Sequence, residues 1–174
     1  MAARVEVRKT YKLYIGGKFP RSESGRSYEV YAAPTRAGAS PKFLANASQG
    51  SRKDARDAVT AARGAQAGWA GATAYNRGQV LYRVAEVMEG RRAQFVEEVR
   101  ASEGVSPSKA DSLVSQAIDR WVWYAGWSDK LPQVLGGLNP VAGPFFNISA
   151  PEPSGVVAVL APQASSLLGL VSVI

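Results

Sequence analysis

The last twenty residues of this 174-residue chain, Gly155 to Ile174, contain no charged side chain. Within them, Val156 to Leu160 is continuously apolar instead of alternating, which is typical of a strand buried on both faces in a parallel sheet. Leu167 to Ile174 then has the composition of the opening of a helix. Because uncovered apolar surface promotes association, this run predicts the front part of a larger fold and not a self-contained domain.

The same run is long enough to be considered as a membrane span, since about 20 apolar residues cross a bilayer. Pro162, Gln163 and three serines interrupt it, however, and no positive cluster flanks its far side. A C-terminal tail anchor is therefore the weaker alternative, and we expect no membrane partner.

Charge and reactive side chains exclude several classes of function. The 21 Lys and Arg residues outnumber the 14 Asp and Glu residues, giving a net charge of +7, but they are scattered and form no basic stripe for nucleic acid. The chain has no cysteine and no histidine, so it lacks a thiol nucleophile, the commonest general base and the usual soft metal ligands. The first residues lack the apolar region of a secretory signal. We therefore expect a cytoplasmic protein with no nucleic-acid partner and no metal site.

Short strands are expected near the start of the chain. Tyr11 to Ile15 alternates polar and apolar residues, meets Gly16-Gly17 and continues as Lys18-Phe19, a pattern typical of a hairpin with a two-residue turn. Ser27 to Tyr31 alternates again and predicts a strand. Lys42 to Ala45 predicts another.

Helical patterns follow, and the first has a clear beginning. Ser51, followed three residues later by Asp54, predicts a capping box. Small apolar residues behind it share one helical face and predict close packing on a neighbour. These residues are Ala55, Ala58, Val59, Ala62 and Ala65.

Two further helices are expected. One follows Asn76, and Gly90 kinks or divides it. Its inward positions are Val80, Leu81, Val84, Ala85 and Met88. The other begins at Ser106, a good N-cap, with Pro107 in the first helical position. Its apolar stripe consists of Ala110, Leu113, Val114, Ala117, Ile118, Trp121, Tyr124 and Ala125.

The last part of the chain returns to strand patterns. Leu135 to Pro144 is rich in glycine and proline and predicts a loop, and Phe145 to Ser149 predicts a strand. In open α/β sheets, ligands bind at the carboxyl ends of strands, and helix N-termini receive their phosphates. The location with functional promise is therefore Ala161 to Ser165, which follows the strand ending at Leu160.

No complete catalytic constellation is present. Ser165 and Ser166 follow the apolar strand, but without any histidine they are expected to cap a helix and not to act as nucleophiles. No glycine-rich phosphate loop of the G-x-G-x-x-G type follows a strand.

Four segments occur together in an order that identifies a family. They are Leu13 to Phe19 (LYIGGKF); the helix Lys53 to Ala67 with Trp69 and Asn76-Arg77-Gly78; Tyr124 to Lys130 (YAGWSDK); and Glu152 to Val157 (EPSGVV), followed by Pro162. Each is modest alone, but jointly they resemble the N-terminal part of an aldehyde dehydrogenase. The resemblance runs from about residue 11 to residue 174.

The resemblance implies an α/β fold: hairpin strands, three helices, an oligomerisation arm and the first strand of a Rossmann-like parallel sheet. It divides the chain into an N-terminal tail over 1–10, the N-terminal part of an NAD(P)-binding domain over 11–140, and the arm over 141–155. The segment 156–174 is expected to supply the first strand and the start of the helix of the dinucleotide-binding sheet, truncated there.

The resemblance also implies NAD(P)-dependent oxidation of an aldehyde to a carboxylic acid through a thiohemiacetal on a cysteine. These 174 residues contain no cysteine, and the family's general-base glutamate and most of its cofactor-binding residues belong to segments that this chain does not match. What it retains of the cofactor site is Leu160, Ala161, Pro162 and Gln163. Weak or no binding of NAD or NADP is therefore expected, and no catalytic residue is assigned.

One position departs from the family pattern. Where the family has Trp-Asn-Phe-Pro, this chain has Gln163-Ala164-Ser165-Ser166. The family's asparagine donates its amide to the oxyanion of the thiohemiacetal, which Ala164 cannot do, and losing one such donor costs about 10²–10³ in turnover.

Two functions stay open at this point. The chain is an N-terminal fragment or truncated form of an aldehyde dehydrogenase-like enzyme, inactive alone, or it is a non-catalytic pseudoenzyme subunit with a structural or regulatory role. In both cases the resemblance implies a homo-oligomer, or a hetero-oligomer with an aldehyde dehydrogenase paralogue, formed through Phe145–Ser149.

Overall fold

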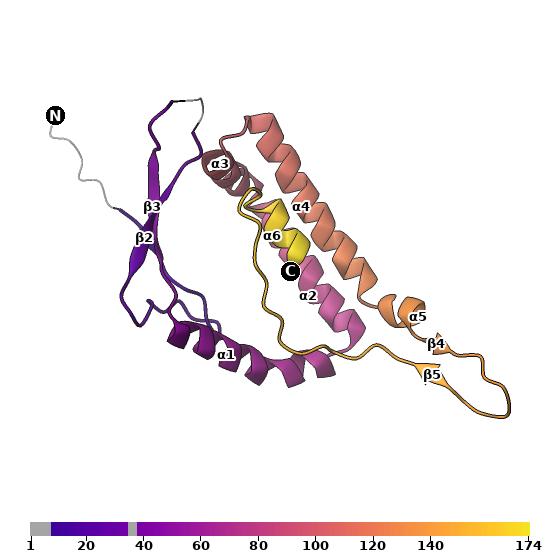
Figure 1. Cartoon of the computed structure of the whole chain (residues 1–174). Coiled ribbons are helices and arrows are strands. Elements are labelled where there is room, and N and C mark those ends of the chain that lie inside the picture. The colour runs from indigo at the N-terminus through magenta and orange to yellow at the C-terminus, as the bar shows by residue number, and fades with distance from the viewer. Residues whose placement is uncertain (1–7, 35–37) are drawn as a thin grey trace, which may run out of the picture.

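The computed structural model describes residues 8–34 and 38–174. Residues 1–7, most of the expected N-terminal tail, lie outside the described residues. Figure 1 shows a small sheet at one end, a group of packed helices beside it, and an arm that projects from the other end. The fold is α/β, with the sheets small and the helices dominant.

The small sheet contains three strands in the order β1-β3-β2. They are β1 (Thr10–Tyr11), β2 (Ser27–Tyr31) and β3 (Phe43–Ser48), with β2 antiparallel and β1 parallel to β3. The expected strand at 27–31 is therefore confirmed, and the strand expected at 42–45 is present but runs from Phe43 to Ser48. The tight turn at Gly16-Gly17 is also confirmed, because both glycines have positive φ (57° and 77°) and Ile15 pairs with Lys18 across it. The flanking strand is shorter than expected, since only Thr10 and Tyr11 pair with β3.

The first helix, α1 (Arg52–Gly71), begins where the sequence predicts. Ser51 Oγ accepts a hydrogen bond from Asp54 N (3.2 Å), and the Asp54 carboxylate accepts one from Ser51 N (2.8 Å). The capping box is therefore confirmed.

The expected close packing of α1 is wrong for this chain. The five small residues predicted to face a neighbour are exposed, and Asp54 is the one buried residue of the helix. Figure 1 shows the reason: α1 runs apart from the other helices, so no described element covers that face.

The core lies among α2 (Ala74–Gly90), α3 (Arg92–Glu103), α4 (Pro107–Trp127) and α6 (Leu168–Val173). The cap of α2 is Thr73 and not Asn76. The helical segment is divided at Arg91, directly after Gly90, into α2 and α3. Ser106 caps α4 and Pro107 opens it, as predicted. The buried positions of α4 match the predicted stripe from Ala110 to Ile118.

Val80 is exposed, contrary to expectation, because it lies at the rim of a groove between α2 and α6.

A short helix that the sequence did not predict, α5 (Leu131–Leu135), precedes the arm. Two-residue strands β4 (Gly137–Leu138) and β5 (Ile148–Ser149) then pair antiparallel. The expected loop over 135–144 thus contains β4, and the expected strand Phe145–Ser149 shortens to two residues. Proline at 140 and 144 and Gly143, with φ 119°, keep the tip out of the ladder.

From Ala150 the chain runs back along the molecule to α6, as Figure 1 shows. The expected buried strand Val156–Leu160 is not formed within this chain: the segment has no strand pairing, and its residues are exposed. A strand needs a neighbour to satisfy its N–H and C=O groups, and no strand among the described residues pairs with this segment. No helix among residues 8–34 and 38–174 is long and apolar enough to cross a membrane.

Candidate functional site

The sequence places the candidate site at the approach to α6. Leu160, Ala161, Pro162 and Gln163 are all exposed, and Leu160 is 95% accessible. Pro162 lies against α6, because a β-carbon added at Gly169 would meet Pro162 Cβ at 3.3 Å and Ser165 Cβ at 2.8 Å. Gly169 therefore permits this close approach, and the segment folds tightly onto the helix that follows it.

Polar contacts fix the turn between this segment and α6. Ser165 Oγ accepts a hydrogen bond from Gly169 N (2.9 Å), in the first turn of α6. The N-cap of α6 is Leu167, however, so the expectation that Ser165 or Ser166 is the N-cap is wrong. Ser166 makes a different contact: its N–H and its hydroxyl both donate to Glu103 Oε1, each at 2.7 Å. Ser102 Oγ lies 3.2 Å from Ser166 Oγ. Sequence reasoning missed Glu103, because nothing in the chain signals that the end of α3 meets a turn more than sixty residues later.

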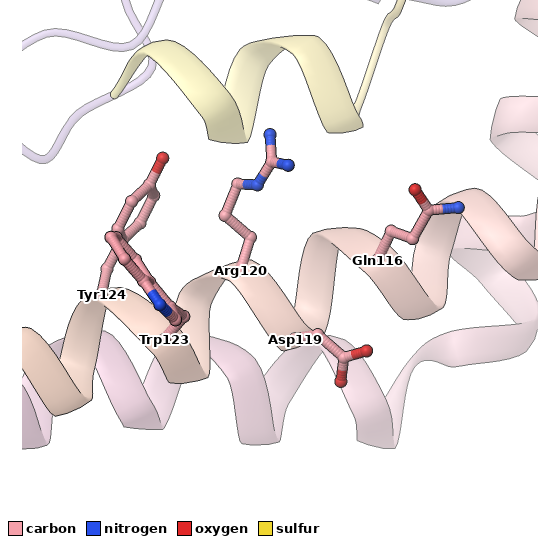
Figure 2. A pocket seen from close by; sticks show the side chains of 5 residues that line it. All are labelled: Gln116, Asp119, Arg120, Trp123 and Tyr124. Carbon is pink, nitrogen blue, oxygen red and sulfur yellow. The ribbon is translucent and has the colours of Figure 1, made fainter.

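A second set of contacts joins α6 to α4. Arg120 donates to Ser172 Oγ, and Tyr124 Oη donates to Ser172 O (3.3 Å). Figure 2 shows Arg120 and Tyr124 reaching from α4 toward α6, whereas Asp119 points away from it. With Gln116 and Trp123 these side chains line an open hollow of about 550 Å³. The aromatic residues of α4 also pack on one another, with Trp123 5.4 Å from both Tyr124 and Trp127 between ring centroids.

An apolar groove of about 660 Å³ runs between α2 and α6. Its lining includes Val84 of α2, Phe95 of α3 and Trp121 of α4, together with Leu170 of α6 and Ile174, which follows α6. Val171 also lines the groove and is almost fully buried. The groove has the apolar character of a core that is open on one side, and not of a site with convergent polar groups.

The four site residues do not by themselves fit a dinucleotide. Three of the four side chains are apolar, and Gln163 is the only one with a hydrogen-bonding group. The amide and hydroxyl of Ser166, two residues before α6, already donate to the Glu103 carboxylate. A carboxylate in that place repels a pyrophosphate. We therefore derive no chemical step at these residues.

Shifted pKa values occur elsewhere, where they stabilise structure. Hydrogen bonds from Ser51 N, Ser22 Oγ and Glu23 N lower the pKa of Asp54 from 3.8 to about 2. The guanidinium of Arg92, 3.0 Å from Asp111 Oδ1, lowers the pKa of Asp111 and has its own pKa raised in return. Asp54 and Asp111 are absent from the linings of the five cavities found among the described residues, so their shifted pKa values give no support for a catalytic pair.

The four family-like segments meet one another in space. A β-carbon at Gly78 would lie 3.0 Å from Ala125 O, which joins the Asn76-Arg77-Gly78 segment to YAGWSDK. A β-carbon at Gly16 would lie 3.5 Å from Ala61, and one at Gly155 3.6 Å from Gln66, so the first and last segments both approach α1. At these glycines, elements pack closely on one another. The family-like segments therefore support a resemblance in fold.

Comparison with known proteins agrees with this arrangement. The family model described as the aldehyde dehydrogenase family matches residues 21–171. A Bacillus subtilis (strain 168) protein that carries the name aldehyde dehydrogenase DhaS is 31% identical over 162 residues, covering 91% of this chain and 31% of that protein. Retinal dehydrogenase 2 of Gallus gallus is 30% identical over 168 residues, covering 94% of this chain and 31% of that protein.

Solved structures share the fold. A betaine aldehyde dehydrogenase double mutant from Staphylococcus aureus, determined in complex with NAD+, superposes with a TM-score of 0.81 at 21% identity, over 94% of this chain and 32% of that one. An NAD-dependent aldehyde dehydrogenase from Sinorhizobium meliloti gives 0.66 at 22% identity, over 76% of this chain and 26% of that one.

The chain has the α/β fold of the matching part of these structures. The chain belongs to the aldehyde dehydrogenase family. It spans about 31% of the length of the curated relatives that it matches.

Proposed function

We propose that this chain forms the N-terminal part of an NAD(P)-dependent aldehyde dehydrogenase-like oxidoreductase, which converts an aldehyde to a carboxylic acid, and that the 174 residues alone are inactive. The observation that carries the proposal is the family match over residues 21–171 in a chain without any cysteine. With no thiol, these residues cannot form the thiohemiacetal that the family's reaction requires. The named activities of the relatives support the reaction class and leave the aldehyde open.

The test is a turnover assay on the purified chain. NAD and NADP are each supplied with short aliphatic, aromatic and betaine-type aldehydes, and reduced cofactor is followed by its absorbance. We expect no turnover above the rate without protein, while a full-length family member in a parallel reaction gives the positive control. Turnover at the level of the full-length enzyme contradicts the proposal.

Cofactor affinity is a separate part of the proposal. We expect a dissociation constant for NAD above about 1 mM, since Gln163 is the only polar side chain among the four site residues and Glu103 already binds Ser166. Calorimetry with the purified chain measures it. Saturable binding at micromolar NAD would place the site elsewhere in the chain.

A second candidate function is a non-catalytic subunit that pairs with an active paralogue, as a hetero-oligomer, or with itself. Ala164 favours it, because an alanine stands where the family has its oxyanion asparagine. The arm favours it too: Phe145 and Phe146 are 71% and 81% exposed, and Ile148 beside them is exposed as well. We propose the segment Phe145–Ser149 as the pairing surface of a cytoplasmic assembly.

Co-expression with a full-length family member distinguishes the two functions. If the chain is a pairing subunit, it co-purifies with the active enzyme, and Phe145→Asp with Phe146→Asp abolishes co-purification. Gln133→Asp with Ser154→Asp, which adds the same charge at exposed polar positions near the base of the arm, leaves it unchanged. Failure of the unaltered chain to co-purify removes the subunit proposal and leaves the first one standing.

A further inference from the structure

A small polar hollow lies on the N-terminal sheet, away from α6 and the arm. It has a volume of about 300 Å³ and is formed by the end of β1, the turn before β2, and the facing ends of β2 and β3. Its lining consists of Thr10, Lys12, Arg21, Ser22, Gly25, Arg26, Ser27 and Ser48, which we call the basic hollow. No lining side chain is acidic or apolar.

Strand register explains why these residues converge. Ser27 lies opposite Ser48, and the parallel pairing of β1 with β3 aligns Tyr11 with Ala47. Continuing that register by one residue brings Lys12 level with Ser48. Side chains at the same level of neighbouring strands lie on the same face of a sheet, so Lys12, Ser48 and Ser27 form a row on one face.

The turn places two guanidinium groups at the end of this row. Gly25 N donates to Ser22 O (3.0 Å), and Gly25 takes the left-handed conformation (φ 67°) that closes the turn. The Arg26 carbonyl accepts a bond from Gln49 N (2.9 Å), which anchors the chain immediately after the turn. Arg21 and Arg26 therefore flank a fixed turn at the mouth of the hollow.

The charges in the basic hollow are uncompensated within the described part of the chain. Among residues 8–34 and 38–174, no ion pair joins Lys12, Arg21 or Arg26 to a carboxylate. The hydroxyls of Thr10, Ser27 and Ser48 also have no side-chain partner there.

Nearby carboxylates are engaged elsewhere. Glu29 pairs with Arg8 (3.8 Å) and accepts a bond from Tyr31. Glu23 pairs with Lys53 (3.6 Å). Asp54 accepts three hydrogen bonds at the N-terminus of α1, one of them from Ser22. Three cationic side chains and three hydroxyls without a side-chain partner thus line one hollow. The one carboxylate bonded to a lining side chain is Asp54, through Ser22, and two backbone N–H groups also donate to it.

We propose that the basic hollow binds a phosphate group that carries at least two negative charges. Guanidinium groups match phosphate oxygens in bidentate geometry, and a lysine adds a point charge. A hollow of about 300 Å³ is at the small end of ligand sites, which suits one or two phosphate units and not a whole dinucleotide. This inference is independent of the proposed function, because it uses none of the residues near α6.

Titration of the purified chain with inorganic pyrophosphate at low salt tests the proposal. Calorimetry is expected to give a dissociation constant of about 0.1–1 mM that weakens several-fold at physiological ionic strength. Arg21→Gln with Arg26→Gln is expected to weaken binding about tenfold. Arg63→Gln with Arg52→Gln removes the same charge from exposed positions on α1 and is expected to change binding less than twofold.

A vesicle experiment identifies the source of the phosphate. Phosphatidylcholine vesicles with and without phosphatidic acid are sedimented with the chain and with both double variants. Binding of pyrophosphate that depends on Arg21 and Arg26 supports a free phosphate compound, and binding confined to phosphatidic acid vesicles with the same dependence supports a lipid phosphate. Equal loss in the α1 control variant, or no binding in either experiment, overturns the proposal.

Discussion

Asp54 performs two functions with one carboxylate. It completes the capping box with Ser51, and it also holds the turn before β2 by accepting bonds from Ser22 Oγ (2.7 Å) and Glu23 N (3.3 Å). The sequence predicts the first function, because capping depends on a local spacing of three residues. It cannot predict the second, because Ser22 lies 32 residues away and only the folded chain brings the two together.

The lowered pKa of Asp54 makes stability depend on pH. Its pKa falls from 3.8 to about 2, chiefly through the bond from Ser51 N and then that from Ser22 Oγ. The folded state therefore binds the proton less readily than the unfolded state, so the stabilisation is complete above pH 4 and is lost as pH falls toward 2. Thermal melts between pH 5 and 2 should show this loss in the parent chain and a flatter profile in Asp54→Asn. Asp57→Asn, on the exposed face of α1, should keep the parent slope; if it flattens the profile equally, Asp54 is not the source.

Glu103 holds the turn into α6 in place. Its Oε1 atom accepts two bonds from Ser166, so Glu103→Ala leaves the turn without its anchor. Net hydrogen-bond contributions of about 0.5–1.5 kcal/mol predict roughly two- to tenfold faster hydrogen exchange at the α6 amides. Mass spectrometry of peptides covering 166–174 measures this. Glu98→Ala on the exposed side of α3 is the matched control and should exchange at the parent rate. Unchanged exchange in Glu103→Ala would mean that packing alone fixes α6.

At the scale of elements, the sequence predicts the existence of helices better than their surroundings. Capping residues and the apolar stripe of α4 are local, and α1, the α2–α3 break and the start of α4 all follow from them. The prediction that one face of α1 packs on a neighbour was wrong. A periodic row of small residues indicates which side of a helix can be covered, but not whether this chain covers it. The short elements α5 and β4 were not predicted, because they have too few residues to show a periodic pattern of apolar residues.

The stripe of α4 should dominate the stability of the helical core. Leu113 is 9% exposed and packs in the cluster formed with α2, α3 and α6. Leu113→Ala should lower the free energy of unfolding by about 2–5 kcal/mol, as buried leucine truncations do. Denaturant titration followed by far-UV circular dichroism measures the change. Val122→Ala, on the exposed side of the same helix, should stay within about 0.5 kcal/mol of the parent. Similar losses in both variants would show that α4 is not packed by its predicted stripe.

At the scale of the whole molecule, three apolar surfaces lie open at once: the small-residue face of α1, the segment 156–160 and the groove between α2 and α6. The candidate site of the sequence, Leu160 to Gln163, adjoins the second of these. Its position along the chain could be predicted from the apolar run and the family-like segment before it. Its geometry could not, because strand burial depends on neighbouring strands that the described residues do not supply.

Exposed apolar backbone and side chains together form a template for association. The segment 156–160 has unpaired N–H and C=O groups, and Val157 is 69% exposed beside Leu160. The purified chain should therefore self-associate with rising concentration, or unfold with weak cooperativity. Light scattering coupled to size-exclusion chromatography, repeated over a range of concentrations, measures the mass.

Val157→Asp with Leu160→Asp should shift the chain toward the monomer, whereas Gln133→Asp with Ser154→Asp adds equal charge at exposed polar positions and should not. A monodisperse parent monomer with one sharp unfolding transition would mean that the segment 156–160 is covered in solution, and that the chain closes its own fold.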